Sequence, residues 1–252
     1  SFYTTLAVCE HLAKLPNPND KVKQMLNNGM KYLDRYELDS YQSRLKRKVK
    51  IWPYDSDCRY LYVSALIPER EVSKDIQKMR EDYLSRMEKA PRDLTIYGVA
   101  NAAYTFRAFG HVKAADKFVH FLKDYTVEKP GQGRFYATDA AYYSWMDYRI
   151  PTQVAAMKAI HQKDKKDPIL NDMQLWLISQ KQVQKWDNPM NTIDVADFLL
   201  KVSPMETFHE NKKPILIVDG TELKEMDYGT INTEHDELEG REANLILEGN
   251  VL

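Results

Sequence analysis

Several features that would indicate particular classes of protein are scarce in this sequence of 252 residues. It has only 9 glycines and 2 cysteines, and it has no run of about 18 apolar residues, the length that spans a membrane. Its 36 basic and 37 acidic residues leave a net charge of -1, which argues against the basic surface of a nucleic-acid-binding protein. We therefore expect no nucleic-acid partner and no direct membrane insertion.

Motifs that carry known chemistry are missing as well. The sequence contains no Gly-rich phosphate loop, no GxSxG elbow and no HExxH pair. Cys9 and Cys58 lie in apolar helical contexts without CxxC spacing, so we interpret both as small buried hydrophobic residues. Zinc-ligand spacing is absent from the six histidines, which are His11, His111, His120, His161, His209 and His235. We predict no catalytic residue, no cofactor site and no metal site.

The sequence opens directly in a helical pattern at Ser1-Phe2-Tyr3, without a methionine or a signal peptide. We expect it to be a domain of a longer protein.

The composition is dominated by leucine, alanine, lysine, glutamate and methionine, which favour helices over sheets. The fold class predicted from this composition is mainly α.

Apolar residues recur at helical spacing from Phe2 to Val202 and predict about nine helices. The expected helices are one at 2–15, one carrying Val22, Met25, Gly29, Leu33 and Tyr36, one capped by Asp55-Ser56-Asp57, one through Val72 and Tyr83, and later ones at 94–109, 111–126, 151–160, 169–180 and 191–202. Asp93 is expected to cap the 94–109 helix and Gly110 to end it.

Nearly all-apolar segments alternate with one-sided amphipathic segments along this part of the chain. The 94–109 and 191–202 helices have the pattern of inner helices, and the 111–126 and 169–180 helices have the pattern of outer ones. Such alternation is typical of a repeat of helical hairpins, in which each pair buries its apolar face on its neighbours.

The pattern changes after Pro204. Pro214–Val218 and Ala243–Leu247 have the composition of strands and are followed by turn residues, whereas the polar and acidic Thr233–Glu242 segment is expected to form a loop. We predict two domains, a helical one at 1–203 and a β segment at 204–252.

One block of the sequence resembles a known family. Trp176-Leu177 with Gln180, then Trp186, then Thr192 and Asp194 are similar to the W-L-x-x-Q and T-x-D motifs that close the thioester domain of alpha-2-macroglobulins and complement proteins. A helical pattern compatible with the same domain extends over about residues 1–202. The turn after Gln180 lacks the usual glycines, which fits a divergent bacterial member.

The resemblance implies an α/α toroid of helical hairpins, here N-terminally incomplete, followed by part of a CUB-like β-sandwich. It also implies a non-catalytic domain of a periplasmic or envelope-anchored protein that entraps attacking proteases and whose other partners are the β-sandwich domains of the same chain. The family's thioester joins a cysteine to a glutamine three residues later, but Leu12 follows Cys9 and Leu61 follows Cys58 at that distance. No thioester is expected in this chain.

Other interpretations stay open. The main alternative is a toroid enzyme acting on polysaccharide, which would use the aromatic cluster Tyr142, Tyr143, Trp145 and Tyr148 with Asp139 or Asp147. Asp55-Ser56-Asp57 faintly resembles the acidic motif of terpenoid cyclases, although capping of a helix explains it as well. The basic run from Arg44 to Lys50 is interpreted as a solvated helix end, or else as a docking patch for an acidic domain.

Overall fold

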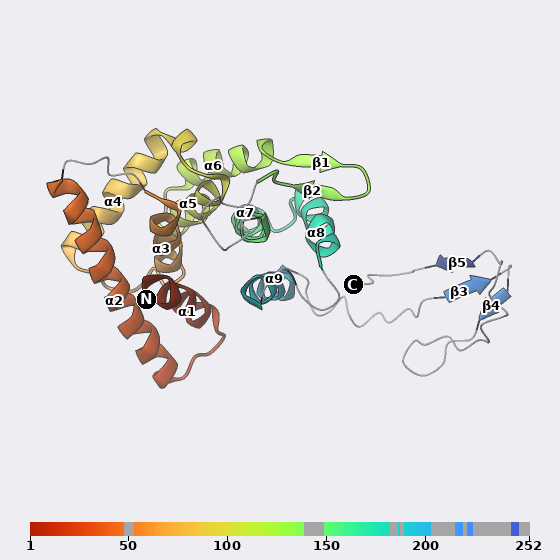
Figure 1. The fold of residues 1–252 in the computed structure, drawn as a ribbon, viewed down its shortest axis with the longest axis horizontal. Coiled ribbons are helices and arrows are strands. Elements are labelled where there is room, and N and C mark those ends of the chain that lie inside the picture. The colour runs from red at the N-terminus through yellow and green to blue at the C-terminus, as the bar shows by residue number, and fades with distance from the viewer. Residues whose placement is uncertain are drawn as a thin grey trace. The chain divides into compact units, whose positions relative to one another are not determined.

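A computed structural model describes residues 1–47, 53–138, 149–181, 186 and 189–202, together with the strands at 215–218, 221–223 and 243–246 (Figure 1). The predicted mainly α class is confirmed, since nine α-helices lie in these residues. The chain divides into two compact units, Ser1–Ala196 and Asp197–Leu252. The division falls inside the last helix, upstream of the boundary that the sequence predicts after residue 203.

The helices follow the predicted order. They are α1 (Phe2–Lys14), α2 (Asp20–Lys46), α3 (Asp55–Ala65), α4 (Lys74–Lys89), α5 (Ile96–Ala108), α6 (Val112–Asp124), α7 (Arg149–Lys163), α8 (Ile169–Ser179) and α9 (Pro189–Val202). None of them, within the described part of the chain, is long and apolar enough to cross a membrane.

Inner and outer helices alternate along the first unit. α3 packs on α1 and α5, and α5 packs on α7, whereas α2, α4, α6 and α8 cover this series from outside (Figure 1). Small residues let the inner helices approach closely: Ala100, Ala102 and Ala103 on α5 are all buried. On α6 only one face is buried, as the sequence predicts for an outer helix.

The ends of α5 differ in part from the prediction. Asp93 does not cap this helix, because it belongs to a short 3-10 turn at Pro91–Asp93. The N-cap is Thr95, whose side-chain oxygen accepts a hydrogen bond from the Gly98 backbone N–H at 3.0 Å. Gly110 does follow the end of α5, with a φ of 84° that a side chain would strain.

A β-hairpin separates α6 from the later helices. Strands β1 (Val127–Lys129) and β2 (Gly133–Phe135) pair antiparallel, with Val127 opposite Phe135. Gly133 has a φ of 81°, and a Cβ there would lie 2.1 Å from the Asp172 carbonyl oxygen of α8. Phe135 stacks on the buried Trp176 with ring centroids 5.3 Å apart, so the hairpin is fixed to α8.

The buried face of α2 differs in part from the predicted apolar set. Leu33 is buried as predicted, but Met25 and Tyr36 are exposed, and Met30 and Glu37 are buried instead. The sequence pattern is misleading because a carboxylate occupies one of the core-facing positions and two large apolar side chains face outward.

The second unit contains a small sheet. Strands β3 (Ile215–Val218), β4 (Thr221–Leu223) and β5 (Ala243–Ile246) are antiparallel and lie in the order β4-β3-β5. The strands predicted from Pro214 and from Ala243 are therefore present. The predicted acidic loop at 233–242 and the aromatic cluster at 142–148, with Asp139, lie outside the described residues.

Candidate functional site

Five charged side chains gather where the inner helices converge, and we call them the inner charge cluster. Each side chain is no more than 18% exposed. The members are Glu10 and Lys14 of α1, Arg59 of α3, Lys158 of α7 and Asp194 of α9. Buried charges are costly unless they are paired, so this arrangement needs a close set of partners.

Glu10 is the acidic centre of one half of the cluster. Its Oε1 lies 2.6 Å from Lys14 Nζ, one turn further along α1, and its Oε2 accepts hydrogen bonds from Arg59 Nη2 at 2.8 Å and Nε at 3.0 Å. The fork of Arg59 joins α3 to α1 with two charge-assisted hydrogen bonds. This contact fixes the orientation of the two neighbouring inner helices.

Asp194 is the acidic centre of the other half. Its Oδ1 lies 3.3 Å from Lys14 Nζ and 3.8 Å from Lys158 Nζ. The first, seventh and ninth helices are thereby joined at one carboxylate. Asp194 is also the aspartate of the T-x-D pattern identified in the sequence.

Three other residues of the same sequence block, Leu177, Trp186 and Thr192, are bound to one another. Trp186 donates from Nε1 to the Leu177 carbonyl at 2.7 Å, and its backbone N–H donates to Thr192 Oγ1 at 3.0 Å. Trp186 is buried. The tryptophan thus holds the end of α8 against the start of α9, where Asp194 follows.

Three tyrosines surround the cluster, namely Tyr62, Tyr97 and Tyr104. Lys14 Nζ lies 5.9 Å from the centre of the Tyr62 ring, and this ring meets that of Tyr104 edge-to-face at 5.0 Å. Burial raises the pKa of Tyr97 to about 12, and burial also raises the pKa of Tyr62 well above its usual value. These phenols therefore stay protonated at neutral pH and are poor general bases.

The protonation states of the cluster follow from its geometry. Burial opposes ionisation of Glu10, but the charges of Lys14 and Arg59 outweigh it and hold the pKa of Glu10 well below its usual range. Burial and the neighbouring ammonium of Lys14 lower the pKa of Lys158 to about 8. Lys158 is thus the member of the cluster whose charge changes most readily near neutral pH.

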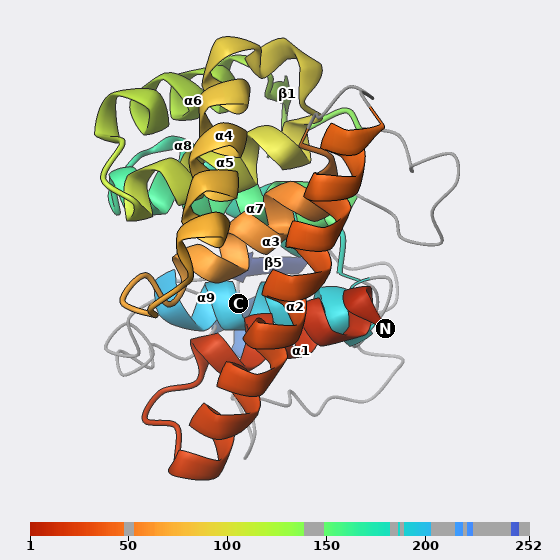
Figure 2. The ribbon, with the colours of Figure 1, turned by 90° about the vertical axis from the view of Figure 1, so that its left-hand side faces the viewer.

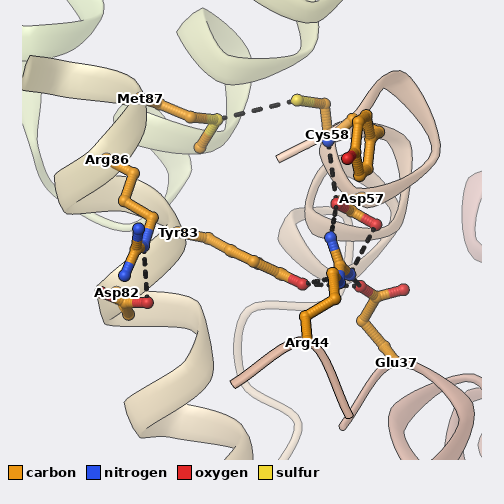
Figure 3. Close-up of polar contacts among 9 residues, drawn as sticks. Glu37, Arg44, Asp57, Cys58, Asp82, Tyr83, Arg86 and Met87 are labelled. Atoms are coloured by element: carbon orange, nitrogen blue, oxygen red, sulfur yellow. Dashed lines mark hydrogen bonds and ion pairs between the residues drawn. The ribbon is translucent and has the colours of Figure 1, made fainter. Parts of the chain in front are cut away.

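A second buried cluster centres on Arg44 and joins α2, α3 and α4 (Figure 3). Arg44 Nη1 donates to Asp57 Oδ2 at 2.8 Å, and its Nη2 donates to Tyr83 Oη at 2.7 Å and to Glu37 Oε1 at 3.2 Å. The Arg44 side chain is only 13% exposed. The prediction of a solvated helix end is therefore wrong for Arg44, although Lys46 and Arg47 are exposed.

Two carboxylates lie together in this Arg44 cluster. Burial, then the charge of Asp57 and a hydrogen bond with it, raise the pKa of Glu37 to about 8. Tyr83 Oη donates to Glu37 Oε1 at 3.0 Å. A proton held on Glu37 lets both carboxyl groups stay buried beside one guanidinium.

The aspartates at the start of α3 have structural partners. Asp57 Oδ2 accepts from the Tyr54 backbone N–H at 2.8 Å, which completes a capping box, while Asp55 Oδ1 accepts from Thr95 Oγ1 at 2.5 Å. Capping thus accounts for Asp57, as the sequence indicates, although the N-cap residue itself is Tyr54. A cyclase role would instead need carboxyl groups free to protonate a substrate.

Both cysteines are buried free thiols, as predicted. Burial raises the pKa of Cys9 to about 11, and burial together with nearby carboxylates raises that of Cys58. Cys58 Sγ lies 3.8 Å from Met87 Sδ (Figure 3). Thiols in such surroundings are inert, because the thiolate is the nucleophile.

Of the inner charge cluster, only Asp194 could be selected from the sequence. A usable signal exists for Lys158, which is the one charge in an otherwise apolar run from Val154 to Ile160 of α7.

Among the described residues, no group of three or more His, Cys, Asp or Glu side chains is placed to hold a metal ion. No protein-family model and no curated protein matches this chain.

Proposed function

We propose that this chain is a non-catalytic α/α-toroid domain of a bacterial alpha-2-macroglobulin-like protein. In this proposal the parent protein lies in the periplasm or is anchored in the cell envelope, and it entraps attacking proteases after cleavage of a bait segment elsewhere. The helical domain acts as a part that keeps its shape while it moves against neighbouring β-sandwich domains.

The observation that carries the proposal is the closing motif. Three of its residues, chosen from the sequence alone, contact one another: Trp186 binds both the Leu177 carbonyl and Thr192. Asp194, two residues after Thr192, belongs to the inner charge cluster. The contacts of Trp186 and Asp194 join neighbouring helices and support a role of the motif in closing the helical array.

The alternation of inner and outer helices supports the same proposal. Hairpins that share a common inner layer fit the toroid of the macroglobulin family. Ion pairs between inner helices resist shear of the array, because breaking a buried pair costs about 3–5 kcal/mol. Such an array suits a domain that transmits movement as one body.

The competing hypothesis is a toroid enzyme on polysaccharide, which requires a base and an acid on the inner helices. Tyr62, Tyr97 and Tyr104 lie there beside cations, which is the feature in its favour. Their raised pKa values and the engagement of Glu10 and Asp194 in ion pairs argue against it. The cations beside Glu10 stabilise it as an anion and make it a weak base.

The test of the proposed function uses the full-length protein that contains this domain. It is incubated with a broad-specificity protease, and the remaining activity is measured on a small chromogenic peptide and on a large protein substrate. Entrapment predicts that hydrolysis of the peptide persists whereas digestion of the protein is lost. Equal loss on both substrates, or loss on neither, would contradict the proposal.

Two variants assign the effect to this domain. Asp194→Asn removes the charge that joins three inner helices, and we expect it to reduce entrapment. Asp124→Asn changes an exposed aspartate on α6 and is the matched control, with entrapment unchanged. Eliminative cleavage of an anionic polysaccharide by the purified chain, abolished by Tyr104→Phe, would instead favour the enzyme.

A further inference from the structure

The outward face of α2 carries a regular stripe of exposed residues. Six of them follow a spacing of four and three residues: Lys21, Met25, Asn28, Tyr32, Arg35 and Asp39, all exposed. This is the spacing of the contact seam of a two-helix coiled coil. The stripe includes Met25 at 51% and Tyr32 at 44% exposure, large apolar groups that the fold leaves uncovered.

An aromatic cluster widens the stripe at one side. Tyr36, 49% exposed, stacks on Phe2 with ring centroids 4.5 Å apart, and Tyr32 lies 6.3 Å from Tyr36. Tyr3, 65% exposed, meets Phe2 edge-to-face at 5.5 Å. Exposed tyrosines grouped beside an arginine have the composition of a protein-protein contact.

The stripe is complementary to itself when it is reversed. In an antiparallel pair centred on residue 30, Lys21 faces Asp39 of a second copy, and Met25 faces Arg35. The central layer joins Asn28 to Tyr32 of that copy. Because the pair has two-fold symmetry, each of these contacts occurs twice, so that two opposite-charge pairs flank an apolar and polar centre.

Among the described residues of the first unit, α2 is an outermost element. The helix lies at the edge of this unit in Figure 1 and runs along the front of it in Figure 2. Its 27 residues give a length of about 40 Å, which allows several heptad layers to meet a partner helix. A parallel arrangement would set Lys21 against Lys21 and Asp39 against Asp39, and is disfavoured.

We propose that this face of α2 binds a second copy of the chain in an antiparallel, two-fold symmetric helix pair. The inference rests on α2 and its flanking tyrosines alone and is independent of the proposed function. Lys21 and Asp39 set the direction and register, while Met25, Tyr32 and Tyr36 supply the apolar contact.

The test is the oligomeric state of the whole chain by sedimentation equilibrium over a range of concentrations. The proposal predicts a dimer with twice the mass of the 29.5 kDa chain. Lys21→Glu and Asp39→Lys each place like charges opposite one another twice and should each weaken dimerisation by roughly ten-fold. The double variant, with the charges exchanged, should recover the wild-type affinity.

Two further variants complete the experiment. Tyr32→Glu should give a monomer, because it places a charge in the central layer. Lys113→Glu makes the same charge change as Lys21→Glu, but on an exposed site of α6, and should leave the dimer intact. A wild-type chain that stays monomeric at about 100 µM, or a double variant no better than the single ones, would overturn the proposal.

Discussion

Lys14 and Asp194 form an ion pair, with Nζ and Oδ1 3.3 Å apart, although 180 residues separate them in the sequence. The pair joins the first described helix, α1, to the beginning of the last, α9. Lys14 is at the same time bound to Glu10, which Arg59 of α3 also holds. A chain of ion pairs therefore runs from α3 through α1 to α9.

Loss of Asp194 should destabilise the first unit strongly. In Asp194→Ala the ammonium groups of Lys14 and Lys158 keep their burial but lose a shared partner, and we expect a loss of about 3 kcal/mol in the free energy of unfolding. Urea denaturation followed by circular dichroism measures it. Asp124→Ala, at an exposed site, should change the same quantity by less than about 0.5 kcal/mol.

Lys158 should make the stability rise at alkaline pH. Its pKa is about 8 in the folded chain, against 10.5 for an ordinary lysine. Between these values the unfolded chain holds a proton that the folded chain has released, so the contribution of Lys158 to stability grows as pH rises and is lost as pH falls through 8. In Lys158→Met this rise should disappear, which denaturation at pH 7 to 10 measures.

If the wild-type protein and Lys158→Met show parallel stability profiles over that range, then Lys158 is not titrating in the buried cluster. Lys117→Met, at an exposed position of α6, serves as the control and should keep the wild-type profile.

Glu37 should have the opposite effect at lower pH. Its pKa is raised from 4.5 to about 8, so between these values the folded chain holds a proton that the unfolded chain lacks. Its contribution to stability is fully present below pH 4.5 and is lost as pH rises through 8. Glu37→Gln keeps the hydrogen bonds without an ionisable group. As pH rises from 4.5 to 8, the unfolding free energy of the wild type should therefore fall relative to that of the variant.

Glu88→Gln, an exposed change on α4, provides the comparison for Glu37→Gln and should follow the wild type at each pH. A constant difference between Glu37→Gln and the wild type from pH 5 to pH 9 would mean that Glu37 is ionised throughout.

The two thiols should be unreactive in the native protein. Cys9 and Cys58 are each 1% exposed and have raised pKa values, so a thiol reagent should label neither until urea unfolds the chain. Methylamine should release no new thiol from this chain, since neither cysteine is followed three residues later by glutamine. Rapid native labelling, or release of a thiol by the amine, would refute this.

The sequence predicts the helical elements well where apolar spacing is regular. Strands β3 and β5 also follow from local composition. The errors have local causes: Thr95 rather than Asp93 caps α5, and Glu37 takes a core-facing position on α2. At the cap, two polar residues compete for the same role within two positions, and on α2 a buried ion pair replaces an expected apolar contact.

The buried charge clusters could not be predicted in the same way. Glu10 and Arg59 are 49 residues apart, and Arg44 and Tyr83 are 39 apart, so no local pattern links them. Only the fold brings these groups together. Asp194 could be selected beforehand because a family resemblance, not a periodicity, directs attention to Thr192 and Asp194.

The central claim, that this is a moving but non-catalytic part of a protease trap, is tested most directly by hydrogen exchange on the full-length protein before and after cleavage by a protease. If the array moves as one body, amides within α3 and α5 keep their protection from exchange. Amides at the surface of the outer helices should change protection, because the domain meets new neighbours after cleavage. Unchanged exchange throughout residues 1–202 after cleavage would contradict it.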